Sequence, residues 1–292
     1  MAHNNHVLDG INKDVGIFGW EWAKDYYLSL ADGWTPYNPD PVVTVHDGIR
    51  CVRDDLIVGT KTRAGDLLAS KTNYSHIVYS QPRTGLAGVS LMDVAKHHNK
   101  KITLFMPSSK RISHHQACCI EQGADVIFKR IAAMPNLNAA AKQYAEENDA
   151  FFVPLGLKHE FATAGIVHAA SMIDEPEEVY VAASTGVLSR ALQIAWPNAK
   201  FHSVAVARNL KAGEAGRVEE VISEPLAFTS PEKPENMPPF PCIDTYDGKV
   251  WKYIPKNTGR DILFWNVGKE PVLQDPTIYD RVDSYRDWDK NL

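Results

Sequence analysis

The chain has 292 residues, of which 44% are hydrophobic and 23% charged, the balance expected of a globular protein with a sizeable core. Its formal charge of −5 gives no general attraction for phosphate backbones, so we expect no general nucleic-acid binding. No stretch approaches the roughly 18 uninterrupted apolar residues that cross a bilayer, and the N-terminus has no apolar signal segment. We therefore expect a cytoplasmic protein without membrane contact.

Cysteine and histidine spacing argues against disulfides and metals. The four cysteines form no Cys-x-x-Cys motif and no disulfide framework. Two adjacent histidine pairs, His97-His98 and His114-His115, lack the ligand set that a zinc site needs. We predict no metal site.

From about residue 75, short β-branched runs alternate with longer helical patterns, which is the rhythm of βαβ units. The expected strands are residues 77–79, 102–107, 126–128, 151–153, 179–182, 201–206 and 262–265. The expected helices are residues 86–98, 113–122, 138–148, 162–173, 189–196 and 246–254. Crossovers of this length favour parallel strands covered on both faces, so the fold class is α/β with three-layer αβα domains. We expect a surface excursion at about 208–242 and a packed arm after Pro271.

Lys61 is the first candidate for chemistry. It follows the acidic segment Arg53-Asp54-Asp55-Leu56 and the turn Gly59-Thr60, just before an apolar helical pattern. A lysine that forms a Schiff base must be neutral part of the time, and burial or a neighbouring cation such as Arg63 lowers its proton affinity. The alternative is a solvated lysine at a helix start.

Three loops at expected strand ends are candidate ligand sites, because ligands of open α/β sheets bind beyond the carboxyl ends of strands. Ser80 to Gly85 offers hydroxyls and a guanidinium, although an ordinary strand-to-helix turn has the same composition. Ala183 to Gly186 is small and hydroxylic, which suits a phosphate. The third region joins Asp244 to Lys249 with Asn266 to Lys269, and its Tyr246 is either a proton donor or a core residue.

Together these pieces resemble fold type II of the pyridoxal-phosphate enzymes, the tryptophan synthase β-like superfamily. They are most similar to its 1-aminocyclopropane-1-carboxylate deaminase and D-cysteine desulfhydrase branch. Arg53 to Arg63 resembles the branch's Arg-Asp-Asp-Leu … Gly-Gly-Asn-Lys-x-Arg segment, and Asp244 to Lys249 resembles Asp-Pro-Val-Tyr-x-Gly-Lys. Met106-Pro107 with Gly123 to Ile127, and Leu263 to Gly268, also match in order. The resemblance spans about residues 50 to 271.

The resemblance implies a role for each site residue. Lys61 would form the internal aldimine with pyridoxal 5′-phosphate and act as a base, with Tyr246 as a second acid or base. The remaining cofactor contacts would come from Ser184, Thr185, Gly186, Ser189 and Asn266, and the substrate contacts from Ser80, Gln81, Arg83, Thr84 and Gly85.

The chain departs from the family pattern at three of these places. Pro82-Arg83-Thr84 replaces Ser-Asn-His, and an arginine here suits a larger or additional anionic group. The phosphate loop has lost most of its glycines, so hydroxyl donors would compensate. Val267 stands where the family has the threonine that bonds the pyridine nitrogen, unless Asn266 takes over.

The resemblance implies two domains, a large cofactor-binding one from residues 1–74 and 164–292 and a small one from residues 75–163, with the cofactor in a cleft between them. It also implies a homodimer. We predict a lyase or deaminase that breaks a bond at the α-carbon of a small amino acid.

Three alternatives stay open. The first keeps the cofactor but acts, by decarboxylation or another lyase reaction, on an amino-acid group attached to a larger carrier such as a modified nucleotide in DNA. The second is a phosphoribosyltransferase-like nucleotide enzyme, although Ala182-Ala183 lacks that fold's paired acidic residues. The third is a relative that has lost catalysis and acts as a binding protein.

Overall fold

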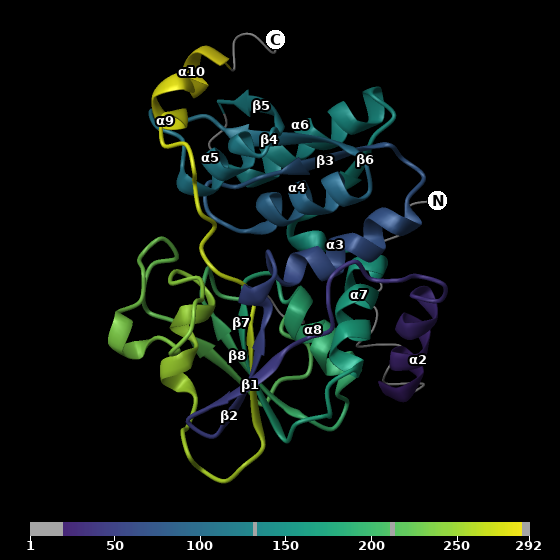
Figure 1. The fold of residues 1–292 in the computed structure, drawn as a ribbon, viewed down its shortest axis with the longest axis vertical. Helices are drawn as coiled ribbons and strands as arrows, with labels where there is room; N and C mark the ends of the chain where they lie inside the picture. The colour runs from purple at the N-terminus through teal and green to yellow at the C-terminus, as the bar shows by residue number, and fades with distance from the viewer. Residues whose placement is uncertain (1–19, 131–132, 211–213, 288–292) are drawn as a thin grey trace. The chain divides into compact units, whose positions relative to one another are not determined.

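The computed structural model describes residues 20–130, 133–210 and 214–287. Figure 1 shows the course of the chain, which divides into two compact units. Unit 1 comprises the described parts of Met1–Leu68 and Lys158–Glu270, and unit 2 those of Ala69–Leu157 and Pro271–Leu292. The tail after Pro271 thus groups with unit 2, whereas we expected it in the large domain. The reason is that its short helices pack against helix α5 (His114–Glu121) and strand β5 (Asp125–Lys129) of unit 2.

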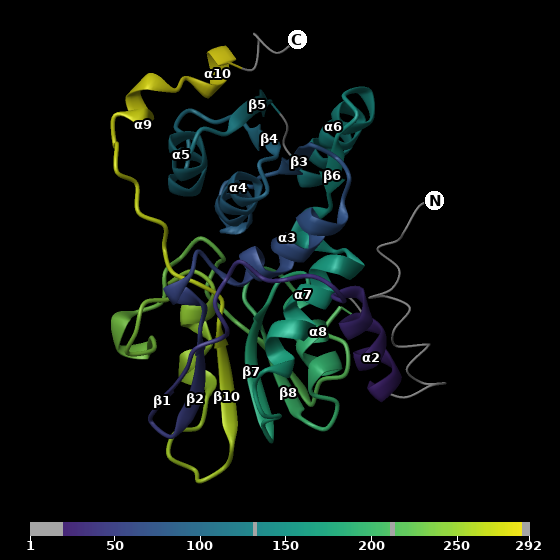
Figure 2. The same cartoon turned by 45° about the vertical axis from the view of Figure 1, so that its right-hand side comes forward.

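Unit 1 is built on a six-stranded sheet with the order β1-β2-β10-β7-β8-β9 (Figure 2). All neighbouring strands are parallel except the edge pair β1 and β2. Strands β7 and β10 are buried along their whole length, which explains their continuous apolar sequences. The strands are β1 (Val43–His46), β2 (Ile49–Arg53), β7 (Glu178–Ala183), β8 (Lys200–Ala205), β9 (Glu220–Ser223) and β10 (Ile262–Asn266).

Helices cover one side of this sheet. Helix α8 contacts β7 and β8, and α7 and α2 pack against it and each other (Figure 2). The helices of unit 1 are α2 (Trp20–Leu30), α7 (Glu160–Ser171) and α8 (Val187–Ala195). Helix α3 (Thr60–Lys71) begins in unit 1 and ends in unit 2.

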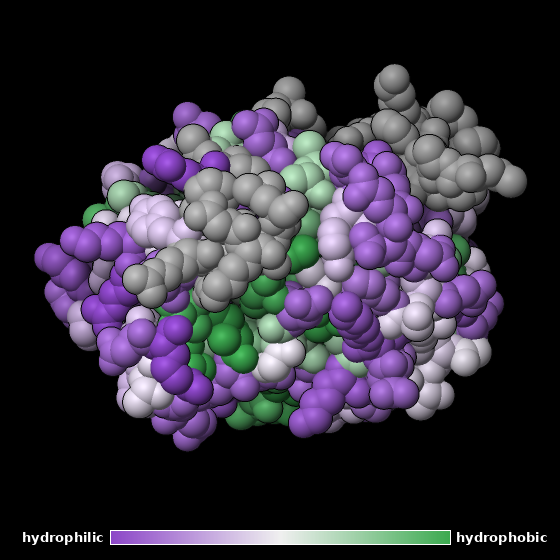
Figure 3. All heavy atoms as spheres, turned by 90° about the horizontal axis from the view of Figure 1, so that it is seen from above, coloured by the Kyte–Doolittle hydropathy of each residue, from purple (hydrophilic) through white to green (hydrophobic). Residues whose placement is uncertain are grey.

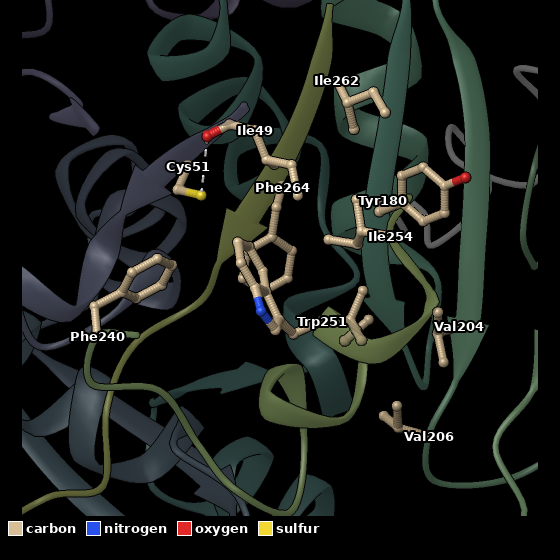
Figure 4. Close-up of a cluster of buried hydrophobic side chains, with 12 residues drawn as sticks. Ile49, Cys51, Tyr180, Val204, Val206, Phe240, Trp251, Ile254, Ile262 and Phe264 are labelled. Atoms are coloured by element: carbon tan, nitrogen blue, oxygen red, sulfur yellow. Dashed lines mark hydrogen bonds between the residues drawn. The ribbon is translucent and has the colours of Figure 1, made fainter. Parts of the chain in front are cut away.

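An irregular segment contributes to an apolar cluster of unit 1. Phe240, Trp251 and Ile254 pack with Phe264 of β10 and Tyr180 of β7 (Figure 4). We expected an α-helix over 246–254, and this prediction is wrong, because the segment forms two 3-10 turns. These turns are η4 (Asp247–Lys249) and η5 (Trp251–Tyr253), and two others in unit 1 are η1 (Asp54–Leu56) and η3 (Pro234–Asn236).

The physical reason lies in Asp247, whose side chain accepts hydrogen bonds from the backbone N–H groups of Ile243 and Val267. An aspartate that binds nearby backbone groups competes with regular helix formation. Gly248 is also closely surrounded, because a Cβ there would lie 3.1 Å from the sulfur of Cys242. The local periodicity is therefore overruled by contacts made elsewhere in the chain.

Unit 2 contains a parallel four-stranded sheet with the order β5-β4-β3-β6 (Figure 1). Helix α6 packs on β3, β4 and β6 around Val78, Phe105 and Leu137. The strands are β3 (His76–Ser80), β4 (Lys101–Pro107), β5 (Asp125–Lys129) and β6 (Phe151–Val153). The helices are α4 (Ala87–His97), α5 (His114–Glu121), α6 (Met134–Glu147), α9 (Ile278–Arg281) and α10 (Ser284–Asp287), with the 3-10 turn η2 (Leu155–Leu157).

The expected α/β alternation is confirmed from β3 onward, with each strand and each of the other five helices found within a few residues of its predicted position. The predictions missed α2, β1, β2, β9 and the short helices of the arm. Among the described residues, no helix has the length and apolar character needed to span a bilayer. The face drawn in Figure 3 carries mainly hydrophilic side chains, with apolar ones gathered in one area.

Candidate functional site

The candidate site of unit 1 lies where three neighbouring parallel strands end. Lys61 comes shortly after β2, Asn266 ends β10, and Ser184 follows β7 directly. Because β2, β10 and β7 are adjacent and parallel, their carboxyl ends meet at one edge of the sheet. This is the edge where open α/β sheets bind ligands.

The turn before Lys61 is fixed by buried polar contacts. Gly59 has a φ of 147°, a region that favours glycine. The hydroxyl of Thr60 donates to Asp54 at 2.7 Å, and its backbone N–H donates to the carbonyl of Val267 at 2.9 Å. Arg63 forms a buried ion pair with Asp54 at 2.9 Å. The carboxylate of Asp54 therefore neutralises the charge of Arg63, the cation that we expected to lower the pKa of Lys61.

Burial is instead what perturbs Lys61, which is half-buried. Burial lowers the pKa of its ammonium, and the nearby carboxyl of Asp247 opposes that shift. Asp247 is fully buried, and its two oxygens accept from the N–H groups of Ile243 at 2.9 Å and Val267 at 2.8 Å. Burial raises the pKa of Asp247 to about 7 despite these two donors. Unit 1 therefore places an amine whose pKa is lowered by burial near a carboxyl group whose pKa is raised by burial.

Tyr246 joins this group to the loop after β7. Its hydroxyl lies 3.4 Å from the hydroxyl of Ser184, to which it donates. Burial raises the pKa of Tyr246 to about 12, so the phenol stays protonated at neutral pH. Tyr246 is therefore placed as a proton donor or hydrogen-bond donor rather than as a base.

Asn266 has one oxygen in need of a donor. Its amide nitrogen donates to Asp55 and to the carbonyl of Pro241, both at 2.8 Å. Two acceptors fix the orientation of the amide, so its oxygen faces the other way. That oxygen is buried and has no hydrogen-bond partner among the described residues. A buried polar atom without a partner is costly, and a protonated ring nitrogen of a ligand would satisfy it.

The loop from Ser184 to Gly186 leads into α8, whose first N–H groups have no acceptor within the helix. Ser184 and Thr185 are half-buried hydroxyl donors beside these groups. Gly186 has a φ of 72°, and a Cβ there would lie 1.7 Å from the carbonyl oxygen of Glu214. The close approach of the backbone at Glu214 therefore requires a glycine at this position, whether or not the loop binds a phosphate.

Ser189 lies apart from this loop and corrects one prediction. It is fully buried, and its hydroxyl lies 2.9 Å from that of Ser203 and 3.3 Å from the carbonyl of Ala215. Gln193 also donates to it at 3.0 Å. These contacts use its hydrogen-bonding capacity inside unit 1, so we remove Ser189 from the candidate cofactor ligands.

The loop predicted to bind substrate, residues 80–85, belongs to unit 2. Gln81 is fully buried and serves the loop itself, because it donates to the carbonyls of Pro82 and Gly85 and accepts from the N–H of Gly88. Ser80 is fully buried at the end of β3. Gln81 is thus a structural residue of this loop, which corrects its predicted role.

The other three predicted substrate-binding residues of this loop are at least partly exposed to solvent. Arg83 is exposed, and Thr84 and Gly85 are half-buried. Gly85 has a φ of 135°, so the glycine is needed for the turn. Their contact with a substrate stays a prediction.

Sequence reasoning missed Asp247 as a site residue. It stands at the variable position of the Asp-Pro-Val-Tyr-x-Gly-Lys pattern, so the motif did not single it out. The available signal was an acidic residue directly after the predicted site tyrosine, Tyr246. Its proximity to Lys61 arises only when β10 is placed between β2 and β7.

Comparison with solved structures identifies the fold. No family model matches the chain, and no curated protein matches it. A 1-aminocyclopropane-1-carboxylate deaminase homologue matches with a TM-score of 0.65 at 16% identity, covering 83% of this chain and 94% of that one. The processed form of threonine deaminase isoform 2 from Solanum lycopersicum matches with a TM-score of 0.66 at 12% identity, covering 86% and 85%. Serine racemase from Dictyostelium discoideum matches with a TM-score of 0.65 at 12% identity, covering 85% and 98%.

The chain therefore has the fold of the fold type II pyridoxal-phosphate enzymes, and the resemblance seen in the sequence is confirmed at the level of fold. This fold removes the structural basis of the phosphoribosyltransferase alternative.

Proposed function

We propose that the protein is a pyridoxal-phosphate-dependent enzyme of the lyase or deaminase type, with Lys61 as the residue that binds the cofactor covalently. The observation that carries this proposal is the pairing of Lys61, whose pKa is lowered by burial, with the buried Asp247 at the carboxyl ends of β2, β10 and β7. An amine must lose its proton before it attacks an aldehyde, and burial supplies that condition.

The residues of unit 1 fit the cofactor. Ser184, Thr185 and the start of α8 would hold its phosphate, and the free oxygen of Asn266 would accept from its protonated ring nitrogen. When bound, pyridoxal phosphate accepts the electron pair released at the α-carbon of an amino acid. The phosphate loop carries fewer glycines than the family pattern, and hydroxyls take their place.

The chain's own groups would then move protons. Lys61, in its neutral form, accepts a proton from the substrate, and its lowered pKa keeps a larger fraction of the amine neutral. Tyr246 holds its proton at neutral pH and can donate a hydrogen bond. Asp247, with a pKa of about 7, exchanges its charge near the working pH and so modulates the charge on Lys61.

The test uses Lys61→Ala beside Lys200→Ala, which removes an exposed lysine at the start of β8. Purified wild type and Lys200→Ala, supplied with pyridoxal phosphate, should absorb in the visible, and borohydride reduction should place the pyridoxyl group on Lys61. Lys61→Ala should show neither. A pyridoxyl group on another lysine contradicts the proposal, and an unlabelled, colourless wild type supports a binding protein without catalysis.

A panel of free amino acids then tests the substrate. Release of a 2-oxo acid from one of them supports the lyase or deaminase assignment. A labelled Lys61 with no turnover of any free amino acid favours the alternative substrate, an amino-acid group on a larger carrier.

A further inference from the structure

Arg83 of unit 2 is held in place without a counter-charge. Its guanidinium donates to the hydroxyl of Ser109 and, at 3.1 Å, to the carbonyl of Arg111. Both acceptors are neutral, and no carboxylate of the described residues forms an ion pair with Arg83. A guanidinium has five N–H donors, so the remaining ones stay open on an exposed side chain. Arg83 is therefore oriented but not neutralised.

More positive charge gathers beside Arg83. Lys110 and Arg111 lie in the loop that holds its guanidinium, and neither has an ion-pair partner among the described residues. The hydroxyl of Ser113, the N-cap of α5, donates to the carbonyl of Arg83. Helix N-termini carry partial positive charge and favour acidic residues, yet the first turn of α5 has none, and the capping box of Ser113 and Gln116 that closes it is uncharged. We call Arg83, Lys110, Arg111 and the start of α5 the basic cluster.

Two buried hydroxyls at the same end of the sheet have no partner. Ser80 ends β3 and is fully buried, and Ser108 directly follows β4, the neighbouring strand. The hydroxyl oxygen of each makes no hydrogen bond to the described residues. Leaving such a group without a partner costs about 1–3 kcal/mol. Both hydroxyls lie at the carboxyl ends of β3 and β4, the strands that lead into the loops of Arg83 and Lys110, where a polar ligand would give them a partner.

The loop that holds Arg83 is itself anchored by the arm. The hydroxyl of Ser284 donates to the carbonyl of Ser109 at 2.7 Å and accepts from its N–H at 2.9 Å. The side chain of Arg111 lies over the ring of Tyr279, with 4.8 Å between the guanidinium carbon and the ring centre. The arm therefore fixes the basic cluster before any ligand arrives, which reduces the entropy lost on binding.

We propose that the basic cluster of unit 2 binds a phosphate group. A carboxylate carries one negative charge, whereas a phosphate monoester carries about 1.5 to 2 and three acceptor oxygens, which better matches three cations and a helix N-terminus. Nη1 and Nη2 of Arg83 each donate one hydrogen bond to the protein, and the N–H groups that Ser109 and Arg111 do not use can bind phosphate oxygens. This proposal rests on unit 2 alone and holds whether or not Lys61 binds a cofactor.

Two sources could supply the phosphate, a small phosphate monoester or the backbone of a nucleic acid. The probes are thymidine 5′-monophosphate, thymidine as the control without phosphate, and a short DNA duplex, each titrated into the full-length protein by calorimetry. We expect the monophosphate to bind at least about tenfold more tightly than thymidine, which corresponds to about 1.4 kcal/mol. Tighter binding of the duplex would identify nucleic acid as the source.

Three variants test whether the phosphate binds at the basic cluster. Arg83→Gln and Lys110→Glu should each weaken phosphate binding about tenfold or more, and Lys110 has no hydrogen-bond partner among the described residues whose loss could disturb folding. Lys142→Gln, which removes an exposed lysine of α6, should bind like wild type. Binding should also weaken as salt rises.

Lys61→Ala separates this proposal from the proposed function, because phosphate binding to the basic cluster should persist in it. Loss of binding in Lys61→Ala alone would overturn the assignment, since it would place the phosphate elsewhere. Equal affinity for thymidine and its monophosphate, or unchanged binding in both cluster variants, would overturn it as well.

Discussion

The variant Asp247→Asn tests the buried carboxyl at the candidate site. In the wild type, burial raises the pKa of Asp247 from 3.8 to about 7. The folded protein therefore keeps a proton between about pH 4 and 7 that the unfolded chain has already released. Stability should fall as pH rises through this window, because the unfolded state binds fewer protons. A shift of about 3 pKa units at about 1.4 kcal/mol each amounts to about 4 kcal/mol.

Asparagine does not titrate, so its contribution is the same at pH 4.5 and pH 8. Its amide nitrogen cannot accept a hydrogen bond, so the N–H group of Ile243 or of Val267 loses its partner, at a cost of about 1–3 kcal/mol. Asp247→Asn should thus be less stable than the wild type at pH 4.5 and equal or more stable at pH 8. This change of order distinguishes burial of a titrating carboxyl from simple loss of a contact.

Urea unfolding followed by tryptophan fluorescence measures the difference in free energy of unfolding between the two proteins. The signal reports on unit 1, because six of the seven tryptophans belong to its sequence ranges. Asp244→Asn is the matched control, since it removes a half-buried carboxylate from the same segment. If the wild type and Asp247→Asn differ by a constant free energy of unfolding from pH 4.5 to 8, the reasoning about Asp247 is refuted.

Two further predictions concern unit 1. Gly186→Ala should lower the free energy of unfolding by about 3 kcal/mol or more, because its Cβ would lie 1.7 Å from the carbonyl oxygen of Glu214. Gly259→Ala is the control, since Gly259 has a similar φ of 75° but open space around it, and this variant should cost only about 1 kcal/mol. Equal melting temperatures for the two variants would contradict the prediction. Burial alone would raise the pKa of Glu232, but hydrogen bonds from Asn236, Lys252 and a backbone N–H outweigh it and lower the pKa to about 2. The wild type should therefore lose about 3 kcal/mol as pH falls from about 4.5 to 2, and Glu232→Gln should lose correspondingly less in acid denaturation; identical acid transitions would argue against the buried network.

Much of the architecture could be predicted from the sequence, because it depends on local patterns. Runs such as Val179 to Ala182 are apolar throughout, and a strand buried on both faces requires this. The intervening helices are long enough for parallel crossovers, which fixed the class of both sheets. The segment around Lys61 also stood out locally, through its acidic residues and Gly59.

Local sequence patterns gave wrong predictions where a polar side chain had more than one possible hydrogen-bond partner. Ser189 and Gln81 are polar residues next to predicted ligand loops, and both turned inward to satisfy buried groups of their own unit. The pattern of 246–254 indicated a helix, but Asp247 bound the backbone on both sides of it and left 3-10 turns. Hydrogen bonds of this kind cannot be read from periodicity, because periodicity shows which positions are apolar and not which polar groups meet.

By itself, the sequence determined the alternation of strands and helices and the choice of Lys61, since both rest on residues that are neighbours along the chain. The groups that surround that lysine, and the cations that share a surface, come together only through the pairing order of the strands. The net charge of −5 concealed the basic cluster, because Arg83 and Arg111 are separated in sequence and meet only when β3 and β4 pair. Strand order sets these distances, and with them the pKa of each buried group.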